Sequence, residues 1–251
     1  MISLDRIIEA HKKIVPHVNY TPLVYSDFLS QNRTVKLKLE SLQITGSFKL
    51  RGAMNKLLSL SEEQKTRGVI AVSTGNHGKG VAYASSLLDI KSTIYMSSMV
   101  PQYRKEAIEL LGAKVEIVGS NSDEADLHAR EVSKKENINF IHPFDDEDII
   151  AGQGTVGLEM IKEFPEVDTV IVPTSGGGLI GGIALALKLQ KPSVKVIAVS
   201  MERGPSMYES LKQGKPVDVE ELETLADCLG GSIGLDNQYT FILLVSVALP
   251  S

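Results

Sequence analysis

Lys49 has the setting of a reactive group. It follows Phe48 and a Thr45–Ser47 turn, and it opens a predicted helix with leucines at helical spacing. A lysine suits the first turn of a helix poorly, because that end already carries partial positive charge. An amine that is neutral or consumed in an imine removes this conflict, and the neutral amine is the nucleophilic form. Taken alone, the stretch is also typical of a solvated surface lysine.

A glycine-rich turn, Ser175–Leu179, follows an apolar strand and opens another predicted helix. Glycines let backbone N–H groups approach an anion, and the helix N-terminus favours negative charge. The turn lacks the Gly-Lys-Ser/Thr of a nucleoside-triphosphate loop, and it is not the Gly-x-Gly-x-x-Gly of a first dinucleotide-binding turn. We interpret it as a phosphate cradle; the alternative is a tight turn without a ligand.

The stretch Ser73–Gly78 repeats this arrangement one strand earlier in the chain. Its hydroxyl and N–H groups could hold a carboxylate, and Asn76 could hydrogen-bond an oxygen on a ring. The alternative is ordinary capping of the helix by serine, threonine or asparagine. His77 is not expected to bind a metal, because no cysteine, histidine or acidic residue lies at ligand spacing. An imine-forming lysine, a phosphate cradle and a carboxylate site together are what pyridoxal phosphate requires.

The elements that position these stretches alternate between strand and helix. Between about 68 and 145 the sequence predicts four strands that alternate with three helices, and hence a small open parallel sheet. A second alternation follows from about 148, after the acidic run Asp145–Asp148. We interpret that run as a solvated helix cap rather than a metal site. The apolar tail Phe241–Ser251 has no predicted closing helix, so we expect an uncovered hydrophobic segment, which implies a covering partner or an incomplete sequence.

The composition excludes several classes of function. The 251 residues are 43% hydrophobic and 23% charged, with a net charge of −5, which argues against the basic surface of a nucleic-acid-binding protein. No apolar run approaches the roughly 20 residues that cross a bilayer. The single cysteine, Cys228, excludes an internal disulfide and indicates a cytoplasmic protein without a membrane role. We expect Cys228 to be a small core residue.

The motifs Gly46–Gly52, Ser73–His77 and Ser175–Leu179, in this order, resemble those of the fold-type II pyridoxal-phosphate family of threonine/serine dehydratases and serine racemases. Val199–Gly204 and Leu229–Asp236 look closest to the hydroxyectoine-utilisation dehydratases. The resemblance implies a two-lobed α/β fold like that of tryptophan synthase β, with parallel sheets flanked by helices. A larger cofactor lobe would comprise 1–67 and 146–251, and a smaller lobe, 68–145, would hold the substrate carboxylate.

The resemblance also implies a role for each matching residue. Lys49 would be the imine lysine and the proton-transfer base, with Phe48 packed near the cofactor. Asn76 would bond the pyridoxal 3′-oxygen. The substrate carboxylate would be held by Ser73, Thr74, Gly75, Asn76 and His77. The phosphate would be bound by the amides of Ser175, Gly176, Gly177, Gly178 and Leu179.

Three features depart from the family pattern. Thr74 stands where racemases of the family place a serine as opposite-face acid/base; threonine keeps the hydroxyl, so racemisation is weakened but not excluded. Ser200 replaces the glutamate that begins the family's divalent-cation site, so no metal is expected there. Family members also continue past the equivalent of Phe241 and there supply a hydroxyl or thiol facing the pyridine nitrogen, so we expect a C-terminally truncated chain.

The sequence therefore predicts a cytoplasmic, pyridoxal-phosphate-dependent ammonia-lyase that converts threonine or serine into a 2-oxo acid and ammonia. We expect a homo-oligomer, such as a dimer, that acts on a small hydroxy amino acid. The first alternative is an amino-acid racemase that uses Lys49 and Thr74 on opposite faces of the substrate. The second is a catalytically silent fragment that binds the cofactor or a full-length partner.

Overall fold

The computed structural model describes residues 2–248, and the chain divides into two compact units. One unit is His11–Pro143, and the other joins Met1–Ala10 to Phe144–Ser251. Helix α1 (Leu4–Ile14) belongs to both. The division expected from the resemblance, into a cofactor lobe and a lobe that holds the substrate carboxylate, assigns functions to parts of the chain. It stays a prediction.

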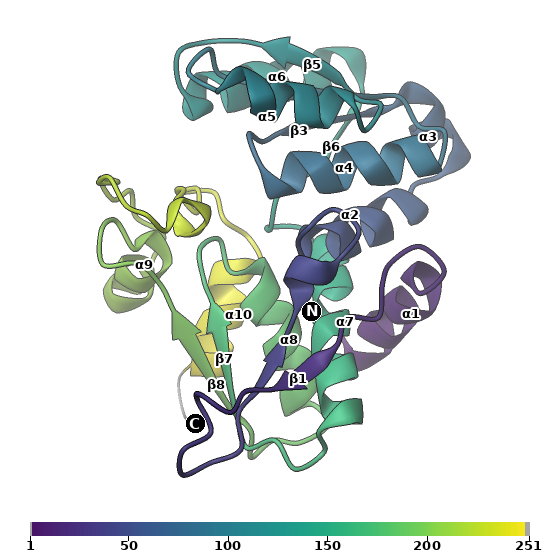
Figure 1. The fold of residues 1–251 in the computed structure, drawn as a ribbon. Coiled ribbons are helices and arrows are strands. Elements are labelled where there is room, and N and C mark those ends of the chain that lie inside the picture. The colour runs from purple at the N-terminus through teal and green to yellow at the C-terminus, as the bar shows by residue number, and fades with distance from the viewer. Residues whose placement is uncertain (1, 249–251) are drawn as a thin grey trace. The chain divides into compact units, whose positions relative to one another are not determined.

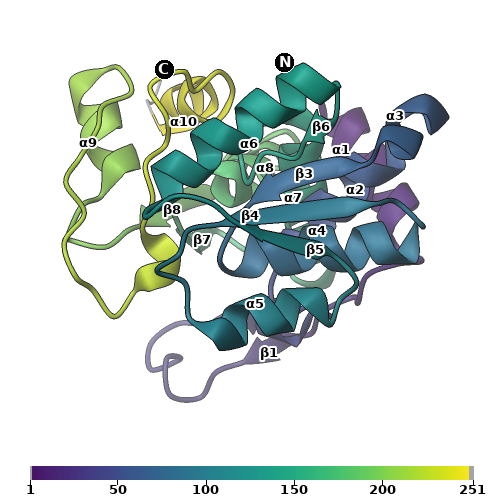
Figure 2. The same ribbon diagram turned by 90° about the horizontal axis from the view of Figure 1, so that it is seen from above.

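The unit His11–Pro143 is built on a four-stranded parallel sheet in the order β5–β4–β3–β6, as the strand–helix repeats predict. Strand β3 lies inside the sheet because its valines, isoleucine and alanine can be buried on both faces. Figure 2 shows α6 on one side of the sheet and α4 and α5 on the other. The strands are β3 (Val69–Val72), β4 (Ser92–Met96), β5 (Lys114–Ile117) and β6 (Asn139–Phe140).

Helix α6 of this unit has a side-chain cap at its start. The side-chain oxygen of Asn121 accepts a hydrogen bond of 2.9 Å from the N–H of Glu124. The helices are α2 (Lys49–Leu58), α3 (Glu62–Arg67), α4 (Asn76–Leu87), α5 (Gln102–Glu109) and α6 (Ser122–Glu136). A short antiparallel pair, β1 (Leu23–Tyr25) and β2 (Lys36–Lys38), and the 3₁₀ turn η1 (Glu40–Leu42) precede them.

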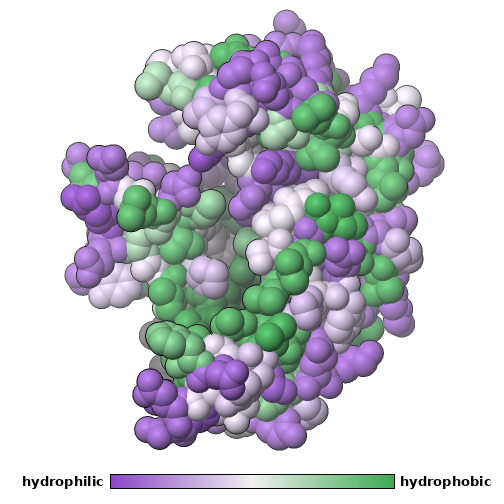
Figure 3. Space-filling model, viewed as in Figure 1, coloured by the Kyte–Doolittle hydropathy of each residue, from purple (hydrophilic) through white to green (hydrophobic). Residues whose placement is uncertain are grey.

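The second unit places helices against one face of the parallel pair β7 (Thr169–Pro173) and β8 (Lys195–Val199) (Figure 1). Val170 and Val172 are buried there against Ile180 and Ile183 of α8. The opposite face carries exposed apolar side chains, and Figure 3 shows a hydrophobic surface where Figure 1 draws these strands. The remaining elements are α7 (Glu147–Glu163), α8 (Gly178–Lys188), α9 (Ser206–Gln213), η2 (Asp227–Leu229) and α10 (Thr240–Ala248).

Helices α7 and α8 cross with their backbones almost in contact. A methyl group added to Gly182 would lie 2.5 Å from the backbone nitrogen of Gly154, and closer still to the carbonyl oxygen of Ile150. No side chain therefore fits between the two helices at this point. The crossing fixes the position of α8, whose first residue ends the glycine-rich turn.

The expectation that the tail lacks a closing helix is wrong. Residues 240–248 form α10, which packs against α8 and α9. Phe241 and Leu244 lie on one helical face and are 8% and 4% exposed, whereas Ile242 on another face is 63% exposed. The segment is thus covered in part by its own unit, and residues 249–251 lie outside the described part. Among the described residues, no helix combines the length and the apolar character needed to cross a bilayer.

Candidate functional site

Lys49 is the first residue of α2, as predicted, and its side chain is half-buried. Its Nζ donates a hydrogen bond of 2.7 Å to the carbonyl oxygen of Pro143 and lies 5.5 Å from the centre of the Phe48 ring. The hydroxyl oxygens of Thr45 and Ser47 are buried and have no hydrogen-bond partner among the described residues. Buried hydroxyls without partners are costly, so the turn before Lys49 suits a polar ligand.

The buried Arg51 holds the start of α2 in place, a role that sequence reasoning missed. Its Nε and Nη2 each donate a hydrogen bond of 2.8 Å to a different carboxylate oxygen of Glu40 in η1. Arg51 is fully buried, and the Thr21 hydroxyl donates a further hydrogen bond to Glu40. A paired and hydrogen-bonded guanidinium is one of the few forms in which an arginine is buried. It ties the helix that starts at Lys49 to the segment before the turn.

The loop Ser73–His77 links the carboxyl end of β3 to α4, whose first residue is Asn76. Ser73, Thr74, Gly75 and Asn76 are half-buried. The Gly75 N–H donates a hydrogen bond of 3.2 Å to the Ser73 hydroxyl oxygen. The loop therefore presents hydroxyls at the positive end of a helix, which is the setting that a bound carboxylate requires.

His77 differs from the rest of this loop because its side chain is 4% exposed. Its Nε2 donates a hydrogen bond of 2.8 Å to the carbonyl oxygen of Ile141, which can only accept. Burial first, and then the positive charge of Lys49, lower the pKa of His77 to about 3. His77 is therefore neutral near pH 7. Because the charge of Lys49 lowers the pKa of His77, Lys49 and the start of α4 lie close together.

The glycine-rich turn Ser175–Leu179 lies in the other unit, between β7 and α8. Gly177 has a φ of +87°, which a side chain would strain, and a methyl group on Gly176 would overlap the Phe144 ring. The Ser175 hydroxyl donates a hydrogen bond of 2.9 Å to the carbonyl oxygen of Gly230. Within the described residues, the backbone N–H groups of the turn have no acceptor. These unfilled donors at a helix start fit a phosphate group.

The acidic run Asp145–Asp148 is half-buried, so it is less solvated than the sequence interpretation suggests. Asp146 does cap α7 by accepting hydrogen bonds from the N–H groups of Asp148 and Ile149, at 2.8 and 3.1 Å. Glu147 and Asp148 pair with Arg6 at 2.6 and 2.9 Å. Asp145 instead binds backbone N–H groups at the start of α10. Each carboxylate thus has protein partners, and no group of three metal-ligating side chains occurs among residues 2–248.

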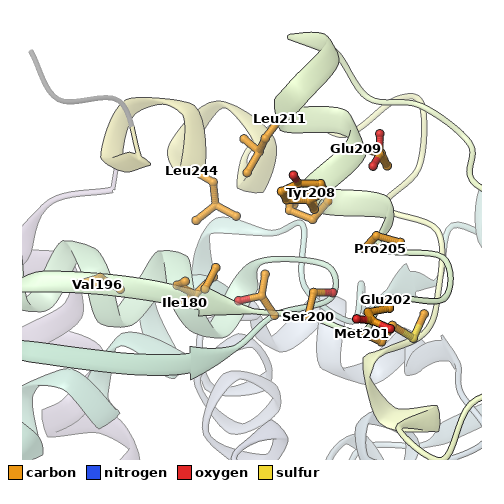
Figure 4. Close-up of a pocket in the computed structure, with 13 residues that line it drawn as sticks. Ile180, Val196, Ser200, Met201, Glu202, Pro205, Tyr208, Glu209, Leu211 and Leu244 are labelled. Carbon is orange, nitrogen blue, oxygen red and sulfur yellow. The ribbon is translucent and has the colours of Figure 1, made fainter.

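A separate apolar pocket with a volume of about 540 Å³ lies beside β8. Tyr208, Leu211 and Leu244 extend toward Val196 and Ile180 across it (Figure 4). Ser200, Glu202 and Glu209 also line it, whereas no predicted cofactor or substrate residue does. This pocket does not coincide with the predicted site. Cys228 lines neither and is exposed, so the expectation of a core cysteine is wrong.

Comparisons with known proteins agree with these motifs. The family model for pyridoxal-phosphate dependent enzymes matches residues 14–246. A putative threonine dehydratase of Sinorhizobium fredii is 47% identical over 242 residues, which cover 96% of this chain and 73% of that protein. The L-threonine ammonia-lyase of Thermotoga maritima is 46% identical over 229 residues, which cover 90% of this chain and 57% of that protein.

The fold has a solved counterpart. The structure of maize serine racemase superposes with a TM-score of 0.92 at 33% identity, and the match covers 98% of this chain and 74% of that one. The chain belongs to the pyridoxal-phosphate dependent enzyme family. Within that family, the predicted resemblance to the fold-type II threonine/serine dehydratases and serine racemases is confirmed. The assignment to the hydroxyectoine-utilisation dehydratases stays a prediction.

Proposed function

We propose that this chain is a threonine/serine ammonia-lyase, which removes the Cα proton and the β-hydroxyl of the amino acid and releases a 2-oxo acid and ammonia. The observation that carries the proposal is the half-buried Lys49 at the start of α2, just after two buried hydroxyls, those of Thr45 and Ser47, that have no partner in the described part of the chain. Identities of 46–47% to proteins named threonine dehydratase or ammonia-lyase support it. Because the chain spans 57% to 73% of their length, the activity stays a proposal.

Lys49 would hold pyridoxal phosphate covalently and carry the Cα proton on its Nζ. When bound, the cofactor stabilises the negative charge that the departing proton leaves behind. The Pro143 carbonyl oxygen accepts a hydrogen bond from Nζ and fixes the direction of the side chain. A general base must be held within reach of the proton that it takes, so this contact contributes orientation. Phe48 would pack near the ring of the cofactor.

The loop Ser73–His77 would bind the substrate carboxylate through its hydroxyl and N–H groups. The His77 side chain is buried and neutral, so it contributes no charge and we assign only its backbone to binding. Positive potential comes instead from the start of α4. Asn76 would bond the pyridoxal 3′-oxygen. Thr74 would lie in the carboxylate loop, and its hydroxyl would act as the opposite-face acid or base of the racemase alternative.

The turn Ser175–Leu179 would bind the cofactor phosphate through its backbone N–H groups. The absence of acceptors for these N–H groups within the described residues supports this role. The assignment of this turn and of Lys49 to one cofactor rests on their joint occurrence in the family.

We further propose that the chain works as a homodimer in the cytoplasm. Light scattering of the purified protein would test the dimer, and fractionation of cells would test the location.

The experiment is to purify the protein with pyridoxal phosphate, reduce it with borohydride and locate the labelled lysine by peptide mass. We expect the label on Lys49 and the release of 2-oxo acid from L-threonine or L-serine. Lys49→Ala should abolish both, whereas Lys56→Ala, a lysine of the same helix, should retain both. A wild-type protein that carries no label on Lys49 would refute the proposal.

The same incubation separates the racemase alternative, which the likeness to maize serine racemase keeps open. D-Serine would accumulate from L-serine if the Thr74 hydroxyl delivers a proton to the opposite face. We expect pyruvate to exceed D-serine, and the reverse ratio would identify a racemase.

A further inference from the structure

Two helices of the second unit, α8 and α10, start side by side. Their N-termini differ in whether the N–H groups have hydrogen-bond acceptors. A methyl group added to Gly177, next to the start of α8, would lie 3.1 Å from the Cβ of Thr240, the first residue of α10. The first N–H groups of an α-helix have no carbonyl acceptor within the helix, so they need acceptors from elsewhere. At α8, the N–H groups of Gly178, Leu179 and Ile180 have no acceptor within the described residues. At α10, side-chain oxygens accept hydrogen bonds from the N–H groups of Thr240 and Phe241.

Asp145 fills the start of α10. One carboxylate oxygen accepts hydrogen bonds of 2.8 Å from the N–H groups of Tyr239 and Thr240, and the other accepts one of 2.7 Å from Gln238. The side-chain oxygen of Asn237 accepts the next N–H, that of Phe241, at 2.9 Å. Hydrogen bonds between a carboxylate and several N–H groups at a helix start are among the stronger ones.

The same stretch of chain also shapes the glycine-rich turn. The Phe144 ring lies where a side chain of Gly176 would be, and its Cα and Cβ would lie 3.1 Å from a methyl group on Gly178. Asp145 is the next residue, and it holds Thr240 against Gly177. The turn is thus enclosed by Phe144 on one side and by Thr240 on the other, and Asp145 connects the two.

We propose that Asp145 is a positioning residue for the anion site at the start of α8. It fills the neighbouring N-terminus with a carboxylate of the protein, so that a phosphate finds unfilled N–H groups at α8 and not at α10. It also fixes Thr240, and through it the conformation of the turn at Gly177. The inference rests on the proposed function, because it takes the ligand of the turn to be the phosphate of pyridoxal phosphate.

The test compares two ligands that differ only in the phosphate. Pyridoxal phosphate and pyridoxal are titrated into cofactor-free wild type, Asp145→Ala and Asp145→Asn, and binding is followed by absorbance. We expect Asp145→Ala to bind pyridoxal phosphate about tenfold more weakly, which corresponds to ~1.4 kcal/mol, and to bind pyridoxal as the wild type does. Asp148→Ala is the matched control, because it removes a carboxylate of the same run that pairs with Arg6 and not with α10.

The outcomes separate the inference from the function on which it rests. If the wild type does not bind pyridoxal phosphate more tightly than pyridoxal, the turn is not a phosphate site. The proposed function is then wrong in its assignment of this turn to the cofactor phosphate. If the wild type does have this preference, and Asp145→Ala keeps it or weakens both ligands equally, only the role of Asp145 is overturned. Thermal unfolding reports whether each variant folds. If the alanine variant does not fold, the same two titrations are made with Asp145→Asn, which keeps one acceptor oxygen, and they decide the role of Asp145.

Discussion

The buried His77 makes the stability of the protein depend on pH, and this dependence can be removed by one substitution. Its pKa in the folded protein is about 3, against 6.5 for an unperturbed histidine, because burial and the charge of Lys49 disfavour the imidazolium form. Between these two values the unfolded chain binds a proton that the folded protein does not. Acid therefore favours the unfolded state, and stability is lost as the pH falls below 6.5.

The magnitude follows from the slope of this linkage. Each pH unit between the two pKa values changes the free energy of unfolding by about 1.4 kcal/mol for one proton. At about pH 5 the contribution of His77 is therefore roughly 2 kcal/mol. This is a sizeable part of the 5–15 kcal/mol that is typical of a folded protein. His77→Gln keeps an N–H that can reach the carbonyl oxygen of Ile141, and it has no proton to gain.

The assay is urea denaturation of the wild type and of His77→Gln at about pH 7.5 and about pH 5. Each protein is compared with itself, so a constant cost of the substitution cancels. We expect the wild type to lose about 2 kcal/mol more than the variant on acidification. Groups that the substitution leaves unchanged are common to both proteins, so their contributions cancel in the difference. Parallel losses in the two proteins would show that His77 is protonated while folded, and the burial argument would then be wrong.

Substitutions at three further positions test the packing around the site. Arg51→Met should leave the Glu40 carboxylate without its positively charged partner and cost about 3–5 kcal/mol in urea denaturation, and an unchanged midpoint would contradict the pairing. Gly182→Ala should force α7 and α8 apart and cost about 1–3 kcal/mol, seen as a lower thermal midpoint; a neutral effect would mean that the helices can separate freely. Asp146→Ala should remove the α7 cap and cost about 1 kcal/mol, whereas Asp146→Ser should restore most of it.

Much of the fold could be predicted from the sequence because its local patterns are unambiguous. The short apolar run Val69–Val72 is a buried parallel strand, and each glycine-rich or polar turn lies between a strand and a helix as expected. Lys49 begins α2 because the preceding Thr-Gly-Ser turn cannot continue a helix favourably. The local setting of each site residue follows from neighbours within a few positions, and these are what a sequence displays.

Burial could not be predicted as well, because it depends on which element covers a face. Leu37 is 42% exposed although its neighbours Lys36 and Lys38 are charged, and Lys38 donates a hydrogen bond to the carbonyl oxygen of Thr21. Cys228 is exposed although cysteines are commonly buried. The tail was expected to be uncovered, but α10 finds its own partners in α8 and α9.

Contacts between distant parts of the chain were equally beyond the sequence. Asp145 binds N–H groups 93 to 95 residues away, and nothing in an acidic run identifies such partners. Arg51 and Glu40 lie 11 residues apart, across a turn and outside helical spacing. A charge pattern shows that partners are needed, but only the fold selects them. Sequence reasoning consequently missed two positioning roles: that of Asp145 at the start of α10, and that of the Arg51–Glu40 pair at the start of α2.

The close crossing of α7 and α8 has a consequence for how this protein can evolve. A side chain at Gly182 has no room unless the backbone around Ile150 and Gly154 retreats, and that retreat lowers the stability of the protein. Variants at these positions would be removed by selection before a compensating change could arise. We therefore expect natural relatives to keep a small residue at both helices here, even where the apolar residues around the crossing have been exchanged freely. Random mutagenesis followed by selection for folded protein would reveal the same restriction within one experiment.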